Sequence, residues 1–119
     1  MKLLEIIRIN NLKTIIMAQK NYTGVSVELN EEGYFLDPKV WTKEMAIEIA
    51  KELDLELSGL HFEVLNYLRM RFNAGEALTI RGVGKSGVVD IKGFYGLFPG
   101  APMKKAAKIA GIPKPASCI

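Results

Sequence analysis

Cysteine and histidine are almost missing from this sequence, with one residue of each among 119. One cysteine excludes an intramolecular disulfide, and so few ligands exclude zinc fingers, zinc ribbons and histidine-rich metal centres. We therefore expect no bound metal and no resident cofactor. With 49% hydrophobic and 24% charged residues, a chain of this length can bury the core of one domain without such cross-links.

Acidic residues are absent from the last quarter of the chain. All 13 acidic residues lie within residues 1–90, whereas every charged side chain in residues 91–119 is a lysine. Two interpretations remain open for this basic segment. It is either a solvated helix face followed by a tail, or a surface for an anionic partner such as RNA, DNA or an acidic protein. Lys104 and Lys108 are the candidates for such a partner surface.

Long apolar runs are also missing. No segment reaches the roughly 18 consecutive apolar residues of a membrane span. The apolar stretch at residues 1–19 is interrupted by Glu5 and Arg8, and no signal-peptide cleavage site follows it. We therefore expect a cytoplasmic protein without membrane contact. Met17 is a plausible second start, so residues 1–21 are interpreted as an N-terminal extension, either an upstream part of the reading frame or an accessory segment.

The first half of the remaining chain predicts a hairpin and a helix. Apolar and polar residues alternate at residues 25–29, turn residues follow at 30–33, and an apolar run resumes at 34–36, which together favour a short β-hairpin. Asp37 and Pro38 then offer an N-cap and a proline at the first helical position. A helix of about four turns is expected from there. Its apolar stripe comprises Trp41, Met45, Ile49 and Leu53.

The second half predicts further helices. Ser58 is expected to cap a helix whose apolar stripe comprises Leu60, Val64, Leu65, Leu68 and Phe72, with Arg69 and Arg71 near its end. A capping or packing role is expected for His61 in this helix. Two short helices at 79–86 and 90–98 have the outline of a helix-turn-helix, and Gly111 ends a last helix at 102–110. The fold class is therefore mostly α, with an N-terminal hairpin.

The last residues are expected to form an extended arm. Pro113 and Pro115 prevent the preceding helix from continuing, so residues 22–111 are expected to form the domain and residues 112–119 a mobile arm that carries Cys118. Cys118 is either an incidental exposed thiol or a carried group that accepts a sulfane sulfur as a persulfide. A free thiol with a pKa of ~8.5 is only a few per cent ionised at neutral pH.

Neighbouring cations would raise the reactive thiolate fraction of Cys118. Lys114 is one candidate because it lies on the arm itself. Arg81 and Lys85, on the body of the domain, are candidates if the arm folds back. These three residues are therefore predicted to dock the arm and stabilise the thiolate.

The sequence LFPGAPMKKAAKIAGIPKPASCI at 97–119 closely resembles the C-terminus of the TusE/DsrC family of sulfur-relay proteins, which includes the gamma subunit of dissimilatory sulfite reductase. The family pattern reads LFP-x-G-P-x-K…K-x-AG-[LI]-PKP-x-x-C-[IV], and the likeness extends upstream to about residue 22. The resemblance implies an orthogonal bundle of short helices with a hairpin. It also implies that Cys118 carries the persulfide and that Arg81 and Lys85 line the groove where the arm docks.

Three positions depart from the family pattern. Members that serve sulfite reductase have a second cysteine eleven residues before the penultimate one, where this chain has Ala107, and the other departures are Phe62 and Ala101. The single cysteine resembles the TusE side of the family, which implies an upstream persulfide donor and a tRNA thiouridylase as acceptor. The alternatives are an accessory protein of sulfite reductase in dissimilatory sulfur metabolism and a single-cysteine DNA-binding regulator.

Overall fold

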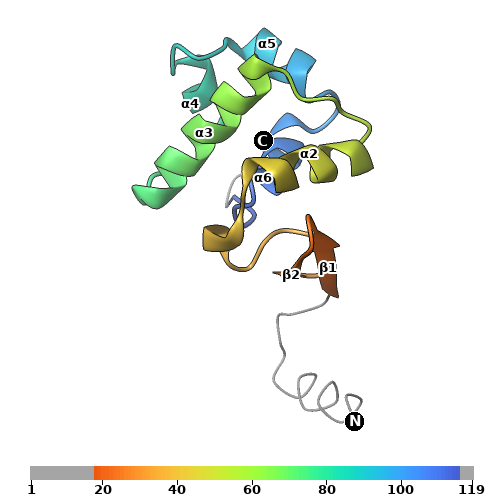
Figure 1. The fold of residues 1–119 in the computed structure, drawn as a ribbon. Helices are drawn as coiled ribbons and strands as arrows, with labels where there is room; N and C mark the ends of the chain where they lie inside the picture. The colour runs from red at the N-terminus through yellow and green to blue at the C-terminus, as the bar shows by residue number, and fades with distance from the viewer. Residues whose placement is uncertain (1–17, 116–119) are drawn as a thin grey trace, which may run out of the picture.

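The structure, a computed structural model, describes residues 18–115. Within these residues a two-stranded antiparallel hairpin precedes one 3₁₀ helix and five α-helices, which confirms the predicted mostly α fold with an N-terminal hairpin. The elements are β1 (Ala18–Tyr22), β2 (Val25–Leu29), η1 (Pro38–Val40), α2 (Lys43–Glu52), α3 (Gly59–Asn73), α4 (Ile80–Gly84), α5 (Ile91–Leu97) and α6 (Pro102–Ile109). In Figure 1 the hairpin lies at the opposite end of the fold from α4 and α5, with α2 and α6 between them.

The hairpin is present, but the prediction of its strands was wrong. β2 pairs with the preceding segment β1, and Tyr22 lies opposite Val25. The two turn residues, Thr23 and Gly24, both have positive φ, at 54° and 84°, as the tight turns of two-residue hairpins require. The segment expected to supply the second strand contributes only an isolated bridge from Phe35 to β2. Residues 18–21 of β1 thus fall within the range expected to be an N-terminal extension, whereas Tyr22 falls within the expected domain.

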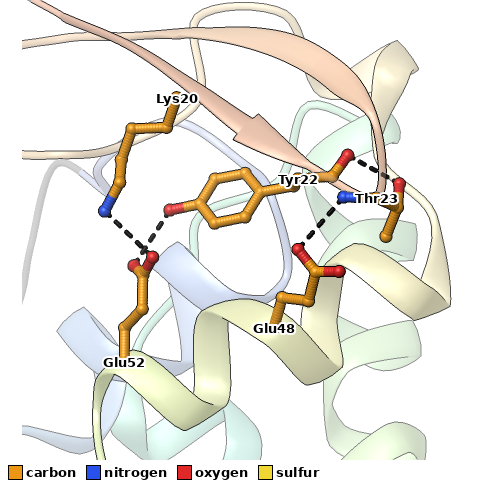
Figure 2. A network of polar contacts seen from close by, with 5 residues as sticks. All are labelled: Lys20, Tyr22, Thr23, Glu48 and Glu52. Atoms are coloured by element: carbon orange, nitrogen blue, oxygen red, sulfur yellow. Dashed lines mark hydrogen bonds and ion pairs between the residues drawn. The ribbon is translucent and has the colours of Figure 1, made fainter.

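Polar contacts attach the hairpin to α2 (Figure 2). Glu52 accepts a hydrogen bond from the Tyr22 hydroxyl at 3.0 Å and pairs with the Lys20 ammonium at 2.9 Å. One turn earlier on α2, the Glu48 carboxylate accepts a hydrogen bond from the backbone N–H of Thr23 at 3.0 Å. Two carboxylates on one helix face therefore hold both a strand and the turn of the hairpin.

Tyr22 gives the hairpin contact a dependence on alkaline pH. Burial, reinforced by the hydrogen bond to Glu52, raises the pKa of the Tyr22 hydroxyl above its ordinary value of 10.0. The neutral hydroxyl therefore stabilises the fold below pH 10, and this contribution is lost as the pH rises through the folded-state pKa. We expect Tyr22→Phe to cost about 1 kcal/mol at pH 7 and less above pH 10. Urea denaturation of both proteins at pH 7 and pH 11 checks this, and a constant difference contradicts it.

The helix expected from Pro38 onward is interrupted, which corrects the prediction. The Asp37 carboxylate accepts from the backbone N–H of Lys39 at 3.0 Å, but it caps only the 3₁₀ turn η1. A second cap, Thr42, accepts from Met45 N–H and begins α2. Between them Trp41 is extended, with φ −68° and ψ 142°. The break exists because Trp41 turns away from the helix path to contact residues far along the chain.

The N-terminus of α3 is fixed by a capping box, as expected from Ser58. The Ser58 backbone N–H donates to Nδ1 of His61 at 3.0 Å. Nε2 therefore holds the ring proton, and it donates to the Leu97 carbonyl at 2.9 Å. The buried face is His61, Val64, Leu65 and Leu68, whereas Leu60, predicted on the apolar stripe, is 38% exposed. His61 has the capping and packing role predicted for it, and it also joins α3 to the end of α5.

Replacing His61 with leucine is expected to lower the free energy of unfolding by about 2–3 kcal/mol, because two hydrogen bonds are lost and the Leu97 carbonyl is left unpaired. His61→Gln should cost about half as much, since glutamine at this position also completes a capping box. Urea denaturation of the two variants checks the prediction. Equal losses for leucine and glutamine would show that ring packing, rather than hydrogen bonding, stabilises this helix end.

The two short helices α4 and α5 form as predicted, and they contact each other closely. Thr79 and Asp90 cap them, accepting from Gly82 N–H at 2.9 Å and from Gly93 N–H at 2.7 Å. A Cβ on Gly84 would lie 2.5 Å from Cγ1 of Ile91, so a larger residue there would have to displace the Ile91 side chain where the two helices meet.

The central helix α6 packs against α2, α3 and α5 (Figure 1). Its buried residues are Pro102, Met103, Ala106, Ala107 and Ile109. Because α6 is held from several sides, the point where the chain leaves its C-terminus has a defined place in the fold. Nowhere between residues 18 and 115 does a helix have the length and apolar character needed to cross a membrane.

Candidate functional site

The predicted reactive residue, Cys118, lies outside the described residues. The structure does describe the segment that connects α6 to the last four residues. We call residues 112–115 the arm base. Gly111 N–H donates to the Lys108 carbonyl and Ile112 N–H to the Ala107 carbonyl, both at 3.2 Å. These two bonds and the positive φ of Gly111, +67°, form a Schellman motif. The chain thus leaves α6 through a defined turn rather than by fraying.

Two side chains from distant elements hold the carbonyls at this turn. Trp41 Nε1–H donates to the Ile109 carbonyl at 2.8 Å. Arg69 on α3 donates to the Ala110 carbonyl at 2.9 Å and to the Pro38 carbonyl at 3.0 Å, and its guanidinium lies 4.3 Å from the centre of the Trp41 ring. We call Trp41 and Arg69 together the carbonyl clamp. Burial lowers the pKa of the Arg69 guanidinium from its ordinary value.

The arm base lies between two loops. The exposed ammonium of Lys114 pairs with Glu32 at 3.1 Å, which connects the arm base to the loop after the hairpin. On the other side, a hollow of about 360 Å³ separates the arm base from the segment after α3. The residues lining it are Phe72, Gly75, Glu76, Ala77, Leu78, Pro113, Lys114 and Pro115. Pro115, the last described residue, is buried and leads to Cys118 three positions later.

The structure brings some of the predicted basic residues together and separates others. Lys108 lies with its ammonium 5.3 Å from the centre of the Tyr34 ring, so Lys108 and Lys114 both reach the loop that contains Glu32. Lys104 is exposed on α6.

Arg81 and Lys85 are exposed at the two ends of α4. Within residues 18–115 neither side chain forms a hydrogen bond or ion pair. α4 follows directly on the segment that lines the hollow beside the arm base. The docking role expected for this pair therefore stays a prediction.

The sequence patterns gave no indication of the carbonyl clamp. Arg69, expected near the end of its own helix, instead donates to the Ala110 carbonyl at the C-cap of α6. It lies four residues after buried Leu65, on one face of a helix that packs against α6. Gly111 predicted where α6 ends, but it did not predict that Trp41 packs against that helix end. Among the described residues no cluster of histidine, cysteine and carboxylates could hold a metal ion.

Comparison with known proteins agrees with this geometry. The family model described as "DsrC like protein" matches residues 21–119. A sulfurtransferase TusE from Buchnera aphidicola is 36% identical over 107 residues, covering 82% of this chain and 93% of that protein. The sulfurtransferase TusE of Escherichia coli K12 is 35% identical over 108 residues, covering 82% and 97%.

Solved structures show the same fold. The oxidized gamma subunit of dissimilatory sulfite reductase (DsrC) from Archaeoglobus fulgidus superposes with a TM-score of 0.74 at 31% identity, covering 86% of this chain and 100% of that one. DsrC from Allochromatium vinosum gives a TM-score of 0.73 at 31% identity, covering 85% and 97%. The family match extends over the helical body, the carbonyl clamp and the arm through its last residue. The chain therefore belongs to the DsrC-like protein family.

Proposed function

We propose that this protein is a sulfur carrier that accepts a sulfane sulfur on Cys118 and passes it to a partner. The observation that carries the proposal is the family match, which runs through residue 119 and so includes Cys118 and its Pro113–Pro115 arm. Relatives named sulfurtransferase TusE, at 35–36% identity, support the same chemistry. The sole cysteine at the end of a proline-containing arm is suited to entering another protein's active site.

The transfer step requires no external oxidant. The Cys118 thiolate attacks the outer sulfur of a donor persulfide, R–S–SH; a sulfur–sulfur bond forms to Cys118, the donor's sulfur–sulfur bond breaks, and the donor leaves as the thiolate R–S⁻. The product is Cys118–S–SH, which delivers its outer sulfur to an acceptor. Cations near the thiol favour the attacking thiolate, and Lys114, Arg81 and Lys85 are the proposed sources of that charge. The protein in this scheme is a carrier without a turnover reaction of its own.

The acceptor proposed here is a tRNA-thiolating enzyme that makes 2-thiouridine, with a persulfide protein as donor, in the cytoplasm. Support comes from the TusE relatives and from the single cysteine. With fully buried Ala107 in place of a second thiol, the chain cannot close an intramolecular disulfide. The second candidate, an accessory role in dissimilatory sulfur metabolism, draws on the likeness to the gamma subunit.

The experiment that tests the carrier proposal is sulfur loading of the full chain. The reduced protein is incubated with inorganic polysulfide, desalted and weighed by intact mass spectrometry. We expect a mass gain of one sulfur atom that is reversed by dithiothreitol. Protein first alkylated with iodoacetamide serves as the control, and a failure of the unblocked chain to gain sulfur overturns the proposal.

A further inference from the structure

We propose that the carbonyl clamp positions the arm: Trp41 and Arg69 set the direction in which the chain leaves α6, and thereby where Cys118 is presented. The inference rests on the proposed function, because it concerns the placement of the sulfur-carrying thiol. Neither side chain is a catalytic residue, since both act on the backbone of the arm's root.

The clamp acts on consecutive peptide groups at the end of α6. The last carbonyls of a helix have no partner within it, and at most helix ends solvent or a nearby side chain satisfies them. Here Trp41 binds the Ile109 carbonyl and Arg69 binds the Ala110 carbonyl, from positions 68 and 41 residues away. Fixing two successive carbonyls fixes the planes of two successive peptides, and so the direction of the next one.

The contact at Gly111 is tighter than a helix end alone requires. A Cβ on Gly111 would lie 2.7 Å from Cγ of Trp41 and closer still to Cδ1, so the ring lies directly against the backbone. Gly75, which follows α3, has a similar φ of +74° but nothing within 4 Å of its Cβ position. Ending a helix therefore demands the backbone conformation but not the covering ring. The ring blocks sideways movement of the chain at the point where the arm begins.

Placing the charged guanidinium of Arg69 at this half-buried position has a cost in free energy. A half-buried cation loses hydration, and apolar side chains of similar size often stabilise such sites equally well or better. Arg69 instead makes two hydrogen bonds to carbonyls that belong to different segments, at Pro38 and Ala110. A guanidinium can bridge two such carbonyls with fixed geometry, whereas an ammonium acts as a point charge. The arrangement thus favours a defined orientation of the two segments over stability alone.

A change at Gly111 acts on the residues that follow it. Cys118 is seven residues beyond Gly111, and Pro113 and Pro115 restrict the backbone of the arm base. A tilt of the peptide planes at Gly111 would therefore shift the arm base and, with it, the point from which the chain continues to Cys118. A partner that accepts the thiol in one active site depends on that placement.

The test uses the fact that Cys118 is the only cysteine. A nitroxide attached to Cys118 of ¹⁵N-labelled full-length protein broadens the amide signals that lie near it. The labelled Cys118 follows Pro115 by three positions, a reach of at most roughly 11 Å, so we expect broadening at the amides beside the arm base, Gly75 to Leu78. In Arg69→Lys and Trp41→Phe, we expect this broadening to fall at least twofold and to spread to other amides.

Matched controls separate positioning from stability. Phe94→Leu alters the buried core at α5, a helix that contributes no residue to the clamp, and should reduce stability while keeping the broadening pattern. Arg69→Lys and Trp41→Phe retain the charge or an aromatic ring, so we expect both variants to fold while they lose hydrogen bonds to the carbonyls. An unchanged broadening pattern in both folded clamp variants overturns the positioning inference and leaves the carrier proposal standing. Absence of sulfur loading on the unaltered chain overturns the carrier proposal and leaves the broadening result intact.

Discussion

Cys118→Ser is expected to abolish the gain of one sulfur atom when the full chain is treated with polysulfide. The reason is compositional as well as chemical: no other thiol exists in the sequence, and neither hydroxyls nor thioethers form persulfides. The loss is therefore complete rather than partial. Intact mass spectrometry of the two proteins, treated in parallel, measures it directly.

The matched control for this result is Lys114→Gln, which removes a charge from the arm base but keeps the thiol. We expect Lys114→Gln to load the same single sulfur atom, more slowly, because the thiolate fraction of Cys118 falls when a neighbouring cation is removed. Loading measured over a time course separates rate from extent. Sulfur still bound to Cys118→Ser would mean that loading occurs elsewhere in the chain and would refute Cys118 as the carrier.

Gly111→Ala is expected to lower the free energy of unfolding by about 2–5 kcal/mol. A φ of +67° costs a residue with a Cβ roughly 1–2 kcal/mol. The added methyl group also displaces the Trp41 ring, which adds an overpacking cost of roughly 1–3 kcal/mol and weakens the hydrogen bond to Ile109. Urea denaturation followed by circular dichroism measures the change.

Gly75→Ala is the control for the backbone part of this effect. Gly75 has a φ of +74° and open space around its Cβ position, so alanine there should cost only the conformational strain of roughly 1–2 kcal/mol. The excess loss at Gly111 then measures the contact with Trp41. Equal losses at the two glycines would show that the ring yields without cost, which contradicts the tight packing described here.

Local chemistry made much of the fold predictable. Ser58 placed a capping oxygen at the start of α3, and Gly111 marked the end of α6, because these signals act within one turn of the chain. The prediction of the hairpin strands was wrong because strand pairing is not decided by local signals. The turn at Thr23–Gly24 is only two residues long, and strand pairing depends on partners that a single alternating segment does not identify.

The residues of the candidate site likewise include some that could be predicted from local sequence and some that could not. Cys118 and the prolines of the arm could be recognised because their meaning lies in residue type and position. The carbonyl clamp could not, since Trp41, Arg69 and Gly111 come from three separate segments, and only tertiary packing brings them together. An arginine within an apolar helix face gave no indication of which carbonyls it would meet.

The ion pair between Lys114 and Glu32 has a consequence for partner binding. Both side chains are about half exposed, at 40% and 48%, so their attraction contributes less than about 1 kcal/mol and weakens with added salt. An acidic group on an approaching protein can therefore replace Glu32 with little energetic loss. The arm base is therefore held firmly at Gly111, whereas its ion pair with Glu32 can be exchanged for a contact with a carboxylate of a partner.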